Sequence, residues 1–172
     1  RHIGSVCGKT LKRVSLELGG KNAQIVLDDA DVDLAVDGVL FGAFGTAGQR
    51  CTATSRLILQ EGIHDRFVEK LVKRAEGMKI GKPWDESVDL GPVINESSMK
   101  KILEYVEIGK KEGAKLECGG YRYENGDCKD GWFLKPAVFT GVKQGMRIEQ
   151  EEIFGPVLSV VKVKTFEEAI DV

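Results

Sequence analysis

Residues 44–57, FGTAGQRCTATSRL, place a single cysteine, Cys51, between two stretches of different periodicity. The stretch before it, 28–44 (DDADVDLAVDGVLFGAF), opens with aspartates suited to a helix N-terminus and then repeats apolar residues at helical spacing. Because glycine is costly inside a helix, we expect this helix to end at the glycines of the loop. The stretch after it, 55–60 (SRLILQ), is typical of a strand. The region therefore indicates a helix, a loop that carries a thiol, and a strand.

The rest of the chain alternates between the same two patterns. Further helices are expected at 63–78, at 95–112 and from a capping-box pattern at Thr165 and Glu168 onward. Further strands are expected in five segments: 11–18, 23–27, 114–120, 133–142 and 156–164. Pro136 predicts an edge position for its strand, because proline cannot donate to a ladder. The order of elements predicts an α/β layered domain with a mostly parallel sheet flanked by helices.

Composition and charge narrow the classes of function. The 172 residues are 42% hydrophobic, enough for one core, and 25 basic against 27 acidic side chains give a net charge of −2. This balance provides no bulk attraction to nucleic acid or to anionic lipid. No apolar stretch approaches the roughly 20 residues of a membrane span, and no signal peptide is recognised. We therefore expect no nucleic-acid partner and no membrane insertion.

The four cysteines, at positions 7, 51, 118 and 128, form neither a CxxC pair nor a dense disulfide framework. This spacing predicts no metal site and favours a reducing, cytoplasmic setting. Cys7, Cys118 and Cys128 lack glycine-rich surroundings, and we interpret them as structural or incidental.

Cys51 differs from the others in its neighbours. Taken alone, a cysteine beside apolar segments is most often an inert core thiol. Gly45, Gly48 and the small residues between them would let the backbone approach a ligand closely, and N–H groups of the turn could stabilise the thiolate, which is the reactive form. Arg50 would either add positive charge there or point away at the surface. Cys51 is thus a candidate nucleophile.

Two acidic positions next to turns are further candidates. Glu17, just before a Gly-Gly turn, is either a solvated glutamate at a sheet edge or a general base at a strand end, where catalytic groups gather in α/β folds. Residues 150–157, QEEIFGPV, hold two adjacent carboxylates before a Phe-Gly-Pro turn. These are either a charged loop tip, or one of them hydrogen-bonds a sugar diol, as acidic residues do in dinucleotide sites.

Three motifs occur together: LELGGKN at 16–22, GQRCT at 48–52 and EEIFGPV at 151–157. Their order and separation resemble the aldehyde dehydrogenase superfamily, and specifically its catalytic domain. The stretches DDADVDLAV and GWFLKPAVFTGV resemble it too, so the similarity covers essentially the whole chain. The resemblance implies oxidation of an aldehyde to a carboxylic acid, with NAD or NADP as the cofactor.

The resemblance also implies a role for each motif residue. Cys51 would attack the aldehyde to give a thiohemiacetal and, after hydride loss, a thioester, with its own N–H as one oxyanion donor. Glu17 would activate the water that hydrolyses the thioester, and its presence favours hydrolysis over transfer to coenzyme A. Glu152 would bind the cofactor's ribose diol, Phe154 would pack near the nicotinamide ribose, and Gly19 would lie close to the cofactor.

The same resemblance implies a fragment of a longer chain. Residues 1–172 would form one domain, most of a catalytic domain, preceded over about 1–18 by the tail end of the cofactor-binding domain. The glycine-rich phosphate motif, the side-chain amide of the oxyanion hole and the oligomerisation strands would lie outside it. The parent is expected to be a homodimer or homotetramer acting on a small-molecule aldehyde, and the isolated chain to be weak or inactive.

Two other classes of function stay open from the residues alone. A hydrolase that uses Cys51 with His64 would cleave esters or peptides without a nucleotide. A non-catalytic chain, serving as an assembly or interaction module, would need neither residue. The choice of aldehyde and the choice between NAD and NADP are not encoded in these residues.

Overall fold

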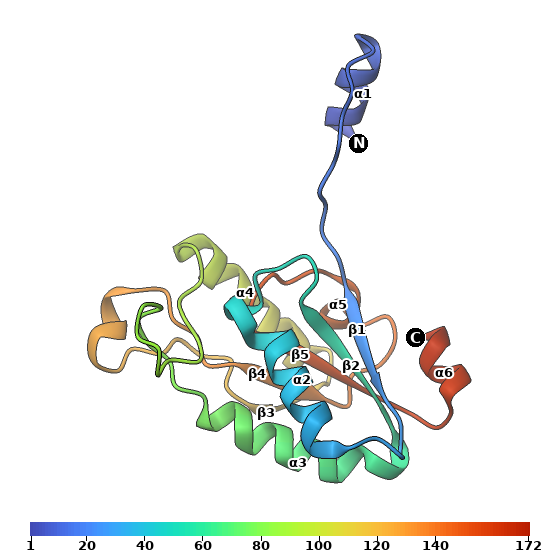
Figure 1. Cartoon of the computed structure of the whole chain (residues 1–172), viewed down its shortest axis with the longest axis vertical. Coiled ribbons are helices and arrows are strands. Elements are labelled where there is room, and N and C mark those ends of the chain that lie inside the picture. Colours follow the sequence, from blue (N-terminus) through green and yellow to red (C-terminus); the bar gives the residue numbers. More distant parts are fainter.

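The computed structural model describes residues 1–172, and its centre is a five-stranded sheet (Figure 1). The strands are β1 (Asn22–Val26), β2 (Thr54–Gln60), β3 (Lys115–Cys118), β4 (Ala137–Thr140) and β5 (Val157–Val163). They lie in the order β1-β2-β5-β4-β3. Neighbouring strands are parallel except β3 and β4, which are antiparallel. The predicted α/β fold with a mostly parallel sheet is confirmed.

The long helices pack on the sheet and bury one apolar face each, whereas the first helix of the chain buries no residue. The long helices are α2 (Val32–Phe44), α3 (Glu61–Gly77) and α4 (Glu96–Lys111), and the short ones are α1 (His2–Lys9), α5 (Arg147–Gln150) and α6 (Phe166–Asp171). Both α2 and α3 contact β2, whereas α4 contacts β3 and α5. The stripe of α3 is the predicted one, with four buried members: Ile63, Phe67, Leu71 and Ala75. No helix combines the length and the apolar composition needed to cross a membrane.

Local sequence signals explain where these helices begin and end. The side chain of Asp31 caps α2 by accepting hydrogen bonds from two N–H groups of its first turn, and the helix ends at Phe44, just before the loop glycines, as predicted. Thr165 caps α6 through a 3.2 Å bond from the Glu168 N–H, and the Glu168 carboxylate accepts from the Lys164 N–H at 2.7 Å. The Thr165 cap is therefore present as predicted, whereas the carboxylate of the capping box reaches the N–H of Lys164 in place of that of Thr165.

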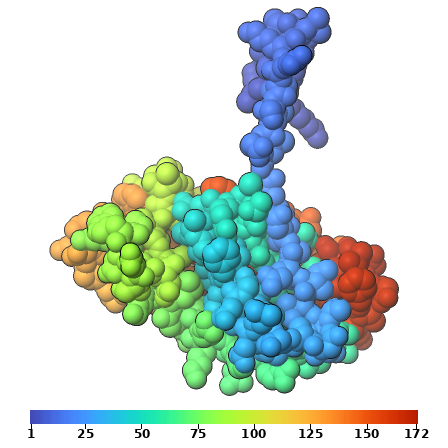
Figure 2. Space-filling view, in the orientation of Figure 1, coloured from blue at the N-terminus to red at the C-terminus, as the bar shows by residue number.

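The expected strand at 11–18 is absent. These residues form an extended arm that carries α1 and stands clear of the body, as both overall views show (Figures 1 and 2). Leu11 is 94% exposed and Leu18 is 69% exposed. The period-two pattern has no neighbouring backbone to pair with, and a strand needs such a partner for its ladder of hydrogen bonds.

The strand expected at 133–142 is present as β4, but its expected edge position is wrong, because β4 lies between β5 and β3. Pro136 stands one residue before β4, where its missing N–H removes no ladder bond. The N–H of Ala137 begins the pairing by donating to the carbonyl oxygen of Pro156 at 2.8 Å.

Candidate active site

The three predicted site segments meet at one edge of the sheet. Glu17 lies ahead of β1, Cys51 ahead of β2 and Glu152 ahead of β5. Because these strands are adjacent and parallel, their amino-terminal ends lie at the same edge. Doubly wound sheets usually bind ligands at the opposite, carboxyl ends of their strands. A prediction based only on the usual ligand site, at the carboxyl ends of the strands, would therefore have placed this site at the wrong edge of the sheet.

The loop that carries the cysteine has a strained backbone. It begins as the 3₁₀ turn η1 (Gly45–Gly48), in which Thr46 and Ala47 both have φ of 54°. Left-handed backbone is unfavourable for residues with a Cβ and persists only where the surroundings hold it. Gln49 contributes to that hold, because its side-chain oxygen accepts from the N–H of Ile94 at 2.8 Å.

Cys51 itself is exposed, whereas Cys118 and Cys128 are buried. Its carbonyl oxygen accepts a 2.5 Å hydrogen bond from Asn22 Nδ2, so the first residue of β1 anchors the loop. The N–H of Cys51 makes no hydrogen bond within the chain and stays available as a donor. The thiol is therefore accessible and stands on an anchored backbone.

Glycines allow the site segments to approach at backbone distance. A Cβ on Gly20 would lie 2.6 Å from the carbonyl oxygen of Cys51, and a Cβ on Gly48 would collide with the carbonyl group of Gly155. Gly48 also has φ of 67°, which favours glycine. Gly155 is itself packed against Ile102 of α4. Larger residues here would push the cysteine loop away from the segments that precede β1 and β5.

The two adjacent carboxylates before β5 have different partners. Glu151 accepts from Arg147 at 2.9 and 3.0 Å and from the Tyr105 hydroxyl at 2.5 Å, and these hydrogen bonds lower the pKa of Glu151 to about 2. Glu152 accepts from the N–H of Gly20 at 3.0 Å through Oε1, while its Oε2 has no hydrogen bond within the chain. Glu152 is thus the carboxylate with an oxygen free to accept from a ligand.

Gly19 and Phe154 lie beside Glu152. A Cβ on Gly19 would collide with the Glu152 carboxylate, so glycine leaves room for it. Phe154 is 42% exposed and has φ of 59°, an uncommon conformation for a bulky residue. Phe154, Glu152, Gly20 and Gly48 line one small cleft, so it is bordered by all three site segments.

Glu17 is the predicted site residue that lies farthest from these contacts. Its side chain is exposed on the arm, and no hydrogen bond or ion pair engages it. It precedes Gly20 by three residues, a span of about 10 Å at most in an extended chain. The structure therefore places Glu17 near the edge without joining it to Cys51.

Arg50 takes the second of its two expected positions, pointing away from the thiol. Its Nη2 donates to the carbonyl oxygens of Phe41 and Gly42 at 3.1 and 3.3 Å, and its guanidinium lies 5.3 Å from the centre of the Phe41 ring. Arg50 therefore caps the last carbonyl groups of α2.

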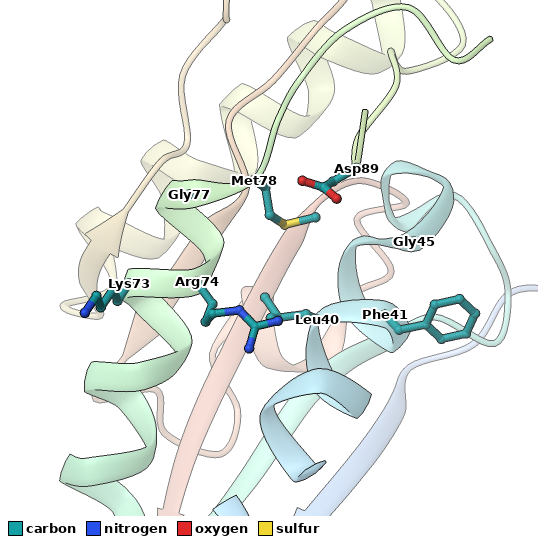
Figure 3. Close-up of a pocket in the computed structure, with 8 residues that line it drawn as sticks. All are labelled: Leu40, Phe41, Gly45, Lys73, Arg74, Gly77, Met78 and Asp89. Atoms are coloured by element: carbon teal, nitrogen blue, oxygen red, sulfur yellow. The ribbon is translucent and has the colours of Figure 1, made fainter. Parts of the chain in front are cut away.

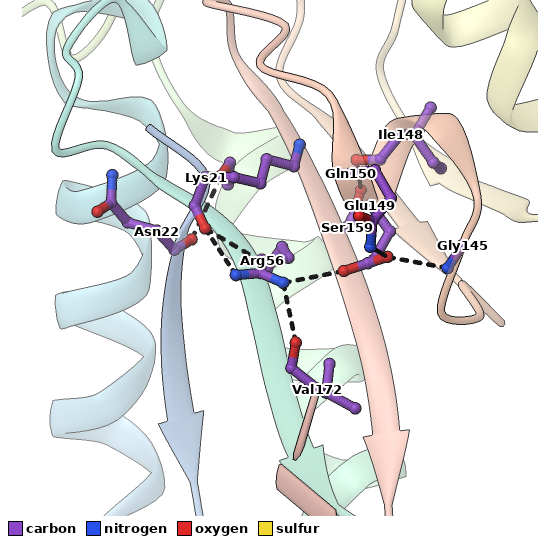
Figure 4. A network of polar contacts seen from close by, with 10 residues as sticks. Lys21, Asn22, Arg56, Gly145, Ile148, Glu149, Gln150, Ser159 and Val172 are labelled. Carbon is purple, nitrogen blue, oxygen red and sulfur yellow. Dashed lines mark hydrogen bonds and ion pairs between the residues drawn. The ribbon is translucent and has the colours of Figure 1, made fainter. Parts of the chain in front are cut away.

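A buried polar network under the same edge was missed by the sequence reasoning (Figure 4). Arg56 of β2 donates to the Glu149 carboxylate at 2.9 Å, and the Glu149 side chain has no exposed surface. Burial acts to raise the pKa of Glu149, but hydrogen bonds from Gln150, Gly145 and Arg56 outweigh it and hold this pKa below its usual value. Glu149 is thus ionised at neutral pH.

Lys21 lies against this pair. Its Nζ is buried and has no hydrogen-bond partner. Burial, assisted by the neighbouring guanidinium of Arg56, lowers the pKa of Lys21 to about 8 despite the opposing effect of the carboxylates of Glu149, Glu152 and Glu151. Arg56 and Glu149 lie outside the three motifs, and Lys21 lies within LELGGKN without being singled out there, because the partners of all three residues come from distant segments.

A pocket of about 470 Å³ lies between α2 and the end of α3 and reaches the cysteine loop only at Gly45 (Figure 3). It is lined by Leu40, Phe41, Gly45, Lys73, Arg74, Gly77, Met78 and Asp89. It contains no thiol and no predicted site residue. We therefore place the candidate site at the amino edge of the sheet and not in this pocket.

His64 is also remote from Cys51. It lies in α3, beyond the carboxyl end of β2, and its Nδ1 is 2.7 Å from the Asp65 carboxylate. β2 spans seven residues, and at about 3.3 Å per residue it separates the two side chains by roughly 20 Å. A dyad of Cys51 with His64 is therefore excluded by the topology.

Comparisons with known proteins agree with this arrangement. The model of the aldehyde dehydrogenase family matches residues 1–172. The chain is 44% identical over 174 residues to the α-ketoglutaric semialdehyde dehydrogenase of Bacillus subtilis (strain 168), covering 99% of this chain and 36% of that protein. It is 49% identical over 161 residues to the human mitochondrial aldehyde dehydrogenase, covering 93% of this chain and 30% of that protein.

Solved structures show the same similarity. A betaine aldehyde dehydrogenase from Staphylococcus aureus, crystallised in complex with NAD+, superposes with a TM-score of 0.95 at 43% identity. The match covers 99% of this chain and 34% of that one. The chain therefore spans about a third of the length of the relatives it matches.

Proposed function

The chain belongs to the aldehyde dehydrogenase family, and from this membership we propose that it supplies the catalytic part of an enzyme that oxidises an aldehyde to a carboxylic acid with NAD(P)+. One observation carries the proposal. The exposed Cys51 and the half-free carboxylate of Glu152 both contact Gly20 at one edge of the sheet. A nucleophile and a ligand for the cofactor would then both lie next to Gly20, which lines the small cleft together with Glu152.

Cys51 is the proposed nucleophile. Its thiolate sulfur forms a bond to the aldehyde carbon, and the negative charge moves to the carbonyl oxygen. The free N–H of Cys51 is the donor proposed to stabilise that oxygen. NAD(P)+, when bound, accepts the hydride that leaves this adduct. Cys51 then carries the acyl group as a thioester.

Glu17 is the proposed base for the second half of the reaction. Its carboxylate takes a proton from the water that attacks the thioester carbon, the sulfur leaves as thiolate, and the carboxylic acid is released. Two observations support this role. The side chain is exposed, and the following Gly19 and Gly20 let the arm change direction toward Cys51.

The residues around Glu152 fit a cofactor ribose. The Gly20 N–H occupies one carboxylate oxygen and leaves the other to accept from the two ribose hydroxyls. The missing side chain at Gly19 provides the space for this carboxylate. We assign Phe154, half exposed in the same cleft, to packing near the nicotinamide ribose. The NAD+ in the crystal structure of the Staphylococcus aureus relative supports NAD or NADP as the cofactor.

We further propose that the chain is part of a longer protein. The coverage of about a third of each relative supports this, as does the arm that stands clear of the body. Residues 1 to about 18 would end the cofactor-binding domain, and the remainder would form most of the catalytic domain. The parent would be a cytoplasmic homodimer or homotetramer, and the isolated chain would turn over weakly or not at all.

The test is NADH or NADPH formation by the longer protein with a panel of aldehydes that includes betaine aldehyde and a semialdehyde. We expect Cys51→Ser to abolish it and Cys7→Ser, a matched change on the arm, to leave it intact. Glu17→Gln should still acylate Cys51 and then stall, so one equivalent of NADH should form rapidly. Ester cleavage without formation of NADH or NADPH from any aldehyde would contradict the proposal.

A further inference from the structure

One guanidinium holds together the segments that form the proposed site (Figure 4). Nε and Nη2 of Arg56 donate to the carbonyl oxygen of Lys21 at 3.2 and 2.8 Å. Its Nη1 donates to the Glu149 carboxylate at 2.9 Å and to the carbonyl oxygen of Val172 at 3.0 Å. Arg56 therefore connects β2 to the segments that precede β1 and β5.

The bonded atoms lie on both sides of the contact that aims Glu152. The Lys21 carbonyl follows Gly20, whose N–H donates to Glu152 at 3.0 Å, and Glu149 precedes Glu152 by three residues. A shift of either segment would change the direction of the Gly20 bond. Arg56 thus fixes the donor side and the acceptor side of that bond at the same time.

The backbone pairing of β1 with β2 is irregular next to Lys21, so backbone hydrogen bonds alone do not hold these segments together. The register between β1 and β2 shifts after Asn22, which pairs with Thr54, while Ala23 pairs with Arg56. A bulge of this kind interrupts the ladder and re-aims the strand. Immediately before this shift, the two bonds from Arg56 to the Lys21 carbonyl connect the segment that precedes β1 to β2.

Resting on the proposed function, we propose that Arg56 is a positioning residue for the cofactor carboxylate Glu152, acting through the Lys21 carbonyl and the buried carboxylate of Glu149. Arg56 touches no substrate in this role. The planar fork of a guanidinium can hold a carbonyl and a carboxylate in fixed relative positions, which the single ammonium of a lysine cannot do.

Arg56→Lys in the full-length protein tests this directly, because it keeps the charge and loses the fork. We expect the Kd of the aldehyde-free enzyme for NAD+, measured by calorimetry, and the KM for NAD+ each to rise about tenfold, as loss of one or two hydrogen bonds would cause. The kcat should stay within about twofold of wild type. Gln60→Ala is the matched control, because Gln60 lies at the other end of β2, and its Kd should be unchanged.

Hydrogen exchange of the Gly20 amide gives a readout that needs no cofactor. In Arg56→Lys the Gly20–Glu152 bond should open more often and this amide should exchange faster, whereas in Gln60→Ala it should not. An unchanged exchange rate in Arg56→Lys would overturn the positioning role, as would a Gln60→Ala variant that binds NAD+ just as weakly. If Arg56→Lys does not fold, Glu149→Gln, which keeps an acceptor oxygen, should show the same two effects.

These outcomes separate the two proposals. A wild-type protein that neither binds NAD+ nor oxidises any aldehyde refutes the proposed function. The amide exchange at Gly20 would still decide whether Arg56 holds this edge in place.

Discussion

The two ends of β2 connect the same three strands in different ways. At the carboxyl end, Gln60 accepts from the N–H of Asp28 at 3.0 Å and donates to the carbonyl oxygen of Lys164 at 3.2 Å. That link is neutral and lies at the surface. At the amino end the link is the ion pair of Arg56 with a fully buried Glu149. The exposed thiol, the close glycine contacts and the strained loop all lie at this second end.

This difference indicates what the buried pair is for. A buried ion pair is a weak source of stability, because the desolvation of both charges offsets much of their attraction, and apolar replacements are often neutral. A neutral amide is enough to hold the strands at the carboxyl end. The ionic link at the amino end therefore points to fixed geometry, which a site assembled from three segments requires.

The largest effect is expected from Arg56→Met. This change leaves a buried, unpaired carboxylate at Glu149, and we expect it to lower the free energy of unfolding by about 3–5 kcal/mol in urea titrations. Arg56→Met combined with Glu149→Met removes both charges and should regain most of that stability. It should not regain NAD+ affinity, and recovery of both would show that the pair serves stability alone.

A smaller effect is expected from Gly48→Ala. The new Cβ would sit on a left-handed residue, which costs about 1–3 kcal/mol, and would also collide with the Gly155 carbonyl. Gly141→Ala is the control, because Gly141 has φ of 64° and open space around it. Thermal unfolding should show a larger loss for Gly48→Ala. Equal losses of stability in the two variants would mean that the collision with the Gly155 carbonyl adds no cost.

The free energy of unfolding should depend on pH through the lowered pKa of Lys21. Below pH 8 both the folded and the unfolded chain hold its proton, whereas between about 8 and its ordinary value of 10.5 only the unfolded chain does. The free energy of unfolding should therefore rise with pH in this window, by about 1.4 kcal/mol per pH unit at most. Urea titrations from pH 7 to 10.5 should show this rise in wild type and a flatter profile in Lys21→Met. Parallel profiles would contradict a lowered pKa.

The smallest effect is expected at the carboxyl end. Gln60→Ala removes two exposed hydrogen bonds, and we expect a loss of about 1 kcal/mol in the free energy of unfolding. Aldehyde oxidation by the longer protein should be unaffected. A loss as large as that of Arg56→Met would remove the contrast between the two ends of β2.

The sequence allowed much of the fold to be predicted. The strand patterns of β1, β2 and β5 and the apolar stripes of α2, α3 and α4 were found, because each burial pattern lies within one segment. The prediction of a strand at 11–18 was wrong for the opposite reason, because strand formation depends on a second segment. The alternation at 11–18 is local, but a strand also needs a neighbour, and the fold provides none there.

The site could be predicted only in part. Cys51 and Glu152 stand in short motifs, and they remain predictions of function that the geometry supports. Arg56 was not predicted as a functional residue, because a polar residue in a strand pattern is usually interpreted as facing solvent. Its partners Lys21 and Glu149 lie 35 and 93 residues away, so no local pattern joins them.

The most direct test of the central claim is the rate at which iodoacetamide alkylates each of the four cysteines, read by peptide mass spectrometry in the folded and in the urea-unfolded chain. Unfolding exposes every thiol equally, so a faster reaction in the folded state measures activation rather than access. We predict that Cys51 alone reacts faster folded than unfolded. A Cys51 that reacts no faster when folded, or that is matched by Cys7, would contradict its assignment as the nucleophile of this edge.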